Sequence, residues 1–170
     1  GQVVKLNVTD PVITAGVSIK KTGYAQTMNN NVMRWTVSGV RNDSTTSLQS
    51  FYWRDTLPTD AVRLTRLVTG TYSTTQTYKV TFTTNLNSQW RTAYDNLSTA
   101  KNYTLDMSSA ALGLASNEYV TQFMLSFGIV PAGFHQLTNA TVDAQTLYAL
   151  TNGYKFTNKA DVGGLLGGNW

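Results

Sequence analysis

The sequence predicts an all-β protein, and three observations lead to this fold class. Charged residues make up only 13% of the 170 residues, about half the usual share in a soluble domain. The chain is rich in Thr, Val and aromatic residues, which favour strands, and in Asn, Ser and Gly, which favour turns. About eight short segments of strand character are separated by such turns, which is typical of a β-sandwich or barrel.

The domain itself is expected to extend over residues 11–164, a length sufficient to bury a sizeable core. Residues 1–10 end in an Asp-Pro pair and are interpreted as a lead-in or the remnant of a preceding domain. Residues 165–170 are interpreted as the start of a linker. The chain is therefore expected to be part of a longer protein.

The first three expected strands lie in residues 15–23, 32–40 and 51–57. In each of them every second side chain is mainly apolar, and side chains alternate between the two faces of a strand. Each strand is therefore expected to bury one face. Pro58 ends the third strand, since proline cannot donate a hydrogen bond to a sheet ladder.

The next two expected strands occupy residues 61–73, with a break near Gly70, and residues 76–85. Glycine in a strand often marks a bend or a bulge. In residues 76–85, Tyr78, Val80 and Phe82 alternate with polar residues, so this strand is expected to bury these three side chains.

A short helix is expected within residues 86–100. Trp90, Tyr94 and Leu97 follow one another at intervals of four and three residues, which places them on one side of a helix. This segment is the one plausible helix in the first part of the chain.

The last part of the domain is expected to complete the sandwich. Residues 102–107 and 118–128 are predicted to be strands, and residues 153–164 are predicted to be the closing strand. Residues 140–152 are compatible with a strand or a helix, because their propensities do not decide between the two.

Composition and motifs exclude several classes of function. The net charge of +4 is scattered along the chain, whereas a nucleic-acid interface needs concentrated basic residues, so we expect no nucleic-acid partner. No apolar stretch is long enough to span a membrane, so we expect no membrane insertion of this segment. There is no cysteine and a single histidine, His135, and neither a nucleophile motif nor a metal-ligand cluster is present. We therefore expect no turnover enzyme, no metal and no cofactor.

Three polar residues occupy positions that alternation assigns to buried faces: Lys21, Asp55 and Asn158. A buried Asp is unfavourable by several kcal/mol unless a partner compensates it. Burial is expected to lower the pKa of a lysine and raise that of an aspartic acid, which would leave a neutral amine beside a protonated acid. Such an amine can attack the Asn side chain and form an intramolecular isopeptide bond, with the acid shuttling protons.

Other assignments of these residues remain open. Lys20 is adjacent to Lys21 and is an alternative amine, and Glu118 is an alternative acid. A salt bridge between Lys21 and Asp55, capped by the amide of Asn158, would also satisfy the three groups. A lysine at a strand end that extends to water is a further alternative.

These motifs resemble the conserved-repeat domains of Gram-positive bacterial surface proteins, which are related to collagen-adhesin stalk domains and pilin subunits. The family opens on a lysine-bearing strand, here "VSIKKTG", and continues with a Trp/Tyr-Thr-Val strand, here "WTV". It then carries "D-x-L-P", here "DTLP", and closes on "N-x-A-x-V", here "NKADV". The resemblance covers residues 15–62 and 154–164, whereas residues 63–153 match poorly. The sorting motif LPxTG is absent; residues 57–61, "LPTDA", are only superficially similar to it.

The resemblance implies an immunoglobulin-like β-sandwich with a longer middle insertion, in a cell-wall-anchored protein outside the bacterial cell. It implies a structural or adhesive role as a stalk or spacer, with neighbouring domains of the same protein as partners. Some relatives carry Lys–Asn isopeptide bonds, which assigns the bond to Lys21 and Asn158 and the acid to Asp55. Bond formation would be a single autocatalytic turnover.

An alternative function is the binding of a host protein or glycan, because tryptophan rings stack on sugars. Trp35 and Trp53 lie on expected core positions, so they are interpreted as packing residues. Trp90 is the better candidate for a ligand contact, and Trp170 ends the chain.

Overall fold

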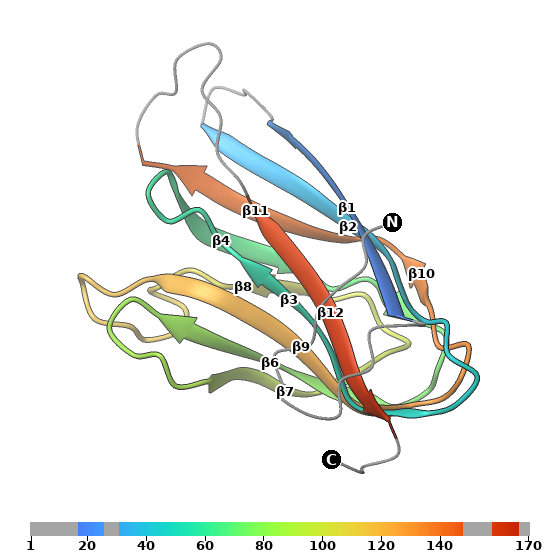
Figure 1. The fold of residues 1–170 in the computed structure, drawn as a ribbon. Helices are drawn as coiled ribbons and strands as arrows, with labels where there is room; N and C mark the ends of the chain where they lie inside the picture. The colour runs from blue at the N-terminus through green and yellow to red at the C-terminus, as the bar shows by residue number, and fades with distance from the viewer. Residues whose placement is uncertain (1–16, 26–30, 148–157, 167–170) are drawn as a thin grey trace.

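Two antiparallel sheets pack face to face in the computed structural model of this chain (Figure 1). The structure describes residues 17–25, 31–147 and 158–166. The described residues form strands, turns and bends and include no helix. The prediction of an all-β sandwich is confirmed.

The first sheet has five strands in the order β1-β2-β11-β4-β8, and all neighbouring pairs are antiparallel. Their bounds are β1 Val17–Ala25, β2 Val32–Asn42, β4 Val62–Val68, β8 Thr104–Asp106 and β11 Ala140–Thr146. Propensity left residues 140–152 undecided, and residues 140–146 of this segment form the central strand β11, because their backbone pairs with β2 on one side and β4 on the other. Residues 148–152 lie outside the described part of the chain.

The second sheet also has five strands, in the order β12-β3-β9-β6-β7. Their bounds are β3 Leu48–Thr56, β6 Thr77–Thr84, β7 Arg91–Ser98, β9 Val120–Val130 and β12 Lys159–Leu166. A small two-stranded sheet joins β5 Thr71–Tyr72 to β10 Gln136–Thr138. The strand β12 continues to Leu166, beyond the domain boundary expected at residue 164.

The break expected near Gly70 separates β4 from β5. Gly70 has a φ of 74°, a left-handed conformation that glycine adopts without a steric penalty. A Cβ atom at this position would lie 2.5 Å from the carbonyl oxygen of Thr138. Glycine is therefore required here for two reasons, backbone conformation and close approach.

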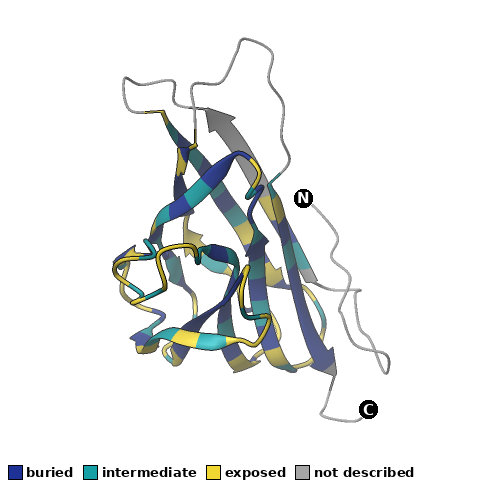
Figure 2. Ribbon diagram, turned by 90° about the vertical axis from the view of Figure 1, so that its left-hand side faces the viewer, coloured by how far each residue is buried: buried dark blue, intermediate teal, exposed yellow. Residues whose placement is uncertain are grey.

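Aromatic side chains fill much of the core between the two sheets. The ring of Phe134 packs against Phe51 at 5.3 Å and is stacked on Tyr72 at 5.8 Å between centroids. Buried polar ends are satisfied within this cluster: Trp53 Nε1 donates to Tyr72 Oη at 2.9 Å, and Tyr72 Oη donates to the carbonyl of Thr69 at 2.8 Å. Figure 2 shows how buried and more exposed residues alternate along the strands, as the sequence pattern predicts.

The helix expected within residues 86–100 is wrong, because residues 91–98 form the edge strand β7. Leu97 pairs with Tyr78, whereas Tyr94 pairs with Val80, so three residues of β7 span two residues of β6. Asn96 lies inside this bulge with a φ of 57°. One inserted residue changes the alternation of side chains, so residues three apart come to share a face, as they would in a helix.

Candidate functional site

Asp55 is fully buried on the inner face of β3, as alternation predicted. Its side-chain neighbours along this face are Trp53 and Leu57, which are 0% and 5% exposed. Across the sheet Asp55 pairs with Ala160 of β12 and with Phe123 of β9, both of which are buried. A carboxylic acid is therefore placed among apolar neighbours on its own sheet.

Asn158 lies directly before β12, two residues from Ala160. Because Ala160 is opposite Asp55, Asn158 is a diagonal neighbour of Asp55, at a typical distance of about 7–8 Å. The amide atoms Nδ2 and Oδ1 of Asn158 are buried, and neither has a hydrogen-bond partner among the residues described. A buried amide without partners is destabilising, which singles this residue out for a functional explanation.

Lys21 lies on β1, the edge strand of the other sheet. Its register partner is Val37, which is fully buried, and Ile19 two residues earlier is also fully buried. The side chain of Lys21 lies outside the described part of the structure. Lys20 pairs with Ser38 and is exposed, so it is the less suitable amine for a buried reaction.

The strands that carry these residues meet at one side of the sandwich. The strand β1 is the edge of the first sheet, β12 is the edge of the second sheet, and the two strands are in contact (Figure 1). The strand β3, with Asp55, is the neighbour of β12. The fold therefore brings the three strands together, although they are far apart in the sequence.

Glu118 lies elsewhere. Its carboxylate accepts hydrogen bonds from Thr84 and Arg91, each at 2.6 Å, and from the backbone of Ala115 at 3.2 Å. The first of these bonds is the largest cause of a lowered pKa of Glu118, which favours an ionised carboxylate. Thr84 ends β6, which is separated from β12 by β3 and β9, so the structure does not place Glu118 beside Asn158.

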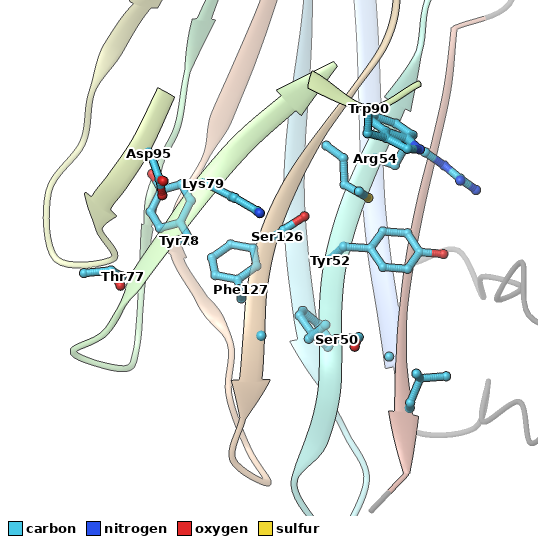
Figure 3. Close-up of a pocket in the computed structure, with 15 residues that line it drawn as sticks. Ser50, Tyr52, Arg54, Thr77, Tyr78, Lys79, Trp90, Asp95, Ser126 and Phe127 are labelled. Carbon is cyan, nitrogen blue, oxygen red and sulfur yellow. The ribbon is translucent and has the colours of Figure 1, made fainter. Parts of the chain in front are cut away.

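The other sequence candidate, Trp90, lines a groove on the outer face of the second sheet (Figure 3). The groove has a volume of about 590 Å³, and Trp90 is 39% exposed. Trp53 and Trp35 are 0% and 7% exposed, so they are packing residues, while Trp170 lies outside the described residues.

The groove also contains residues that the sequence reading did not identify, among them Tyr52, Arg54 and Lys79. The available signal was alternation: Tyr52 and Arg54 lie between the inward residues of β3 and therefore on its outer face. Alternation showed which face they occupy but not that this face is hollowed.

Neither a metal-ligand cluster nor a membrane-spanning helix occurs among the described residues. No group of three or more His, Asp or Glu residues in this part of the chain could hold a metal ion. No helix in the same residues could cross a lipid bilayer.

Comparisons with family models, with curated proteins and with solved structures found no match for this chain. The function is therefore inferred from the geometry of the two sites described above.

Proposed function

We propose that the chain is a structural or adhesive domain of a bacterial cell-surface protein, acting as a stalk or spacer and locked by an isopeptide bond between Lys21 and Asn158. The observation that carries this proposal is the buried Asp55 next to the buried amide of Asn158. The likeness of the flanking motifs to surface-protein domains supports the location outside the cell.

The reaction would balance without an oxidant or a cofactor. The amine Nζ of Lys21 forms a bond to Cγ of Asn158, and the bond from Cγ to Nδ2 breaks. The protonated Asp55 donates a hydrogen bond to the amide, which makes Cγ more electrophilic. It then gives its proton to Nδ2, which leaves as ammonia, and regains a proton from the neutral amine of Lys21. Fixed proximity in the core provides most of the acceleration.

Such a bond would suit a domain that transmits force. It would join the first described strand to the last one, which are in contact at the side of the sandwich. By the entropy of loop closure, a covalent link over most of the chain stabilises the folded state by about 5 kcal/mol. The chain contains no cysteine, so a disulfide cannot perform this task.

The test is the intact mass of the purified protein. We expect a mass lower than that of the sequence by one ammonia molecule, and the full sequence mass in Lys21→Ala and Asn158→Ala. Lys20→Ala is the matched control, because Lys20 is exposed, and it should keep the lower mass.

A wild-type mass equal to the sequence mass would overturn the cross-link. If Lys20→Ala loses the lower mass and Lys21→Ala keeps it, the amine of the cross-link comes from Lys20 and the assignment to Lys21 is wrong.

A further inference from the structure

We propose that the groove on the outer face of the second sheet binds a neutral oligosaccharide. This proposal goes beyond the spacer role and does not depend on the cross-link, because Asp55 and Asn158 occupy the opposite, inner side of the sheet. Its volume of about 590 Å³ lies within the usual range of small-ligand sites.

Irregularities in three neighbouring strands shape the floor of the groove. The register shifts between Phe51 and the residues on either side of it in β3, and again near Gly164 in β12. Ser50 and Gly128, which both line the groove, have φ values of 51° and 74°. Bulges bend strands and redirect side chains, and a strained non-glycine residue such as Ser50 is typical of functional sites.

Two glycines form part of this floor: the space beside Gly128 is free of other atoms, whereas Gly164 is closely packed. A Cβ atom at Gly128 would meet no other atom within 4 Å, whereas one at Gly164 would lie 3.1 Å from Cβ of Leu48. The floor of the hollow is thus formed by hydrogen-bonded strands, so its shape is fixed before a ligand arrives, whereas Trp90 lines the groove from the connection before β7.

Aromatic rings supply the surfaces on which sugars can stack. Trp90 and Tyr52 line the groove and lie on the same side in Figure 3, with Arg54 between them. The guanidinium of Arg54 is 5.5 Å from the ring centroid of Tyr52. Large aromatic faces with polar groups at their edges suit the C–H faces and equatorial hydroxyls of a sugar ring.

A row of hydrogen-bonding groups crosses the groove beside these rings. Ser126 of β9 pairs with Tyr52 of β3 on one side and with Lys79 of β6 on the other. Directly paired residues share a face of the sheet, so the two hydroxyls and the ammonium form a line over three strands. Such a line can donate to and accept from successive hydroxyls of a ligand.

The charges of the groove favour a neutral ligand. Arg54 is paired with Asp161 through two hydrogen bonds, of which Nε to Oδ1 measures 2.9 Å. Lys79 and Asp95 provide one charge of each sign among the lining residues. With Asp161 counted against Arg54, the charges in and beside the groove cancel, whereas an acidic glycan or a nucleic acid would need an excess of positive charge.

The position of the groove also disfavours an extended peptide. Peptides that bind to sheets commonly add a strand to a free edge, where the backbone can form hydrogen bonds. Here β9 is paired with β3 on one side and with β6 on the other, so recognition must use side chains. Side-chain hydroxyls, charges and aromatic faces are the means by which proteins recognise carbohydrates.

The experiment is a screen of the purified chain on an array of neutral and acidic oligosaccharides, followed by titration calorimetry with the best neutral trisaccharide. Trp90→Ala and Tyr52→Ala should each weaken binding at least about tenfold. Leu86→Ala is the matched control, because Leu86 lies in the same connection as Trp90 and is 57% exposed but does not line the groove. It should leave the affinity unchanged.

Charge is tested with Lys79→Ala against Lys101→Ala, since both lysines are exposed and only the first lines the groove. Lys79→Ala should weaken binding and Lys101→Ala should not. Thermal melts of all variants exclude a loss of folding as the cause.

The proposal is overturned if no neutral glycan on the array binds, if only acidic glycans bind, or if Trp90→Ala leaves the affinity intact. Concentration-dependent self-association that disappears in Trp90→Ala, without glycan binding, would instead assign the groove to a second copy of the chain. These results leave the mass test of the cross-link unaffected.

Discussion

Asp55 and Asp143 are both buried, but Asp55 lies on the inner face of its sheet, whereas Asp143 lies on the outer face of the other sheet. Asp143 is 1% exposed on β11 and pairs directly with Arg34 of β2 and Arg66 of β4. Arg34 Nε lies 2.7 Å from Oδ1, and Arg66 Nη2 lies 2.8 Å from Oδ2. The register partners of Asp55 on its own sheet, Ala160 and Phe123, are in contrast apolar.

The contrast shows two ways in which a fold can bury a carboxyl group. Asp143 faces outward between two arginines, whose side chains cover it while their charged ends reach water. Burial raises the pKa of Asp143, but the hydrogen bonds from Arg34 and Arg66 outweigh this effect and leave the pKa below its ordinary value. We therefore expect Asp143 to stabilise the fold as an anion, and Asp55 to serve the reaction proposed for the core.

The largest expected effect is that of Asp55→Asn, which keeps the shape of the side chain but removes the acid. Without proton transfer the cross-link should not form, so the protein should regain the full sequence mass. The free energy of unfolding should fall by about 5 kcal/mol, the stabilisation expected from the closed loop. Mass spectrometry and urea denaturation measure the two results.

A variant that keeps the lower mass would show that Asp55 is not needed for the bond. The matched control is the equivalent change in the other carboxylate.

That change, Asp143→Asn, is expected to reduce the free energy of unfolding by about 2 kcal/mol while the lower mass persists. A fully buried ion pair that loses one partner costs about 3–5 kcal/mol, but Arg34 and Arg66 are 31% and 49% exposed, so water screens part of the loss. Urea denaturation provides the measurement. An unchanged denaturation midpoint would contradict the stabilising role of the arginine pair.

Acidification should gradually remove the contribution of Asp143 to the free energy of unfolding. Because its pKa in the folded protein is lowered, the stabilisation is fully present above the unfolded value of 3.8 and is lost as the pH falls through the folded pKa. The difference in stability between wild type and Asp143→Asn should be constant near neutral pH and shrink below about pH 4. A stability difference that grows on acidification would mean that the pKa of Asp143 is raised in the folded protein, not lowered.

The smallest effect is expected for Glu118→Gln. This carboxylate contacts Arg91 and Thr84 at the C-terminal end of β6, a strand that β9 and β3 separate from β12. The lower mass should persist, and the denaturation midpoint should change least among these variants. Loss of the lower mass would identify Glu118 as the acid and would contradict the assignment to Asp55.

The sequence by itself determined the class of the fold and the face on which most side chains lie. Alternation is a local property of an extended chain, so the burial of Asp55 followed from its spacing to Phe51 and Trp53. The burial of Trp35 and Trp53 followed from the same pattern, whereas Trp90, which precedes β7, was assigned to a helix.

Only the tertiary structure decided what depends on pairing between distant segments. The strand β7 was mistaken for a helix because one bulge residue, Asn96, changes the side-chain period, and a bulge is defined by its partner strand. The contact of β1 with β12 and the groove over β3, β9 and β6 likewise arise from strand order. Local spacing cannot encode that order, because it results from packing two sheets around one core.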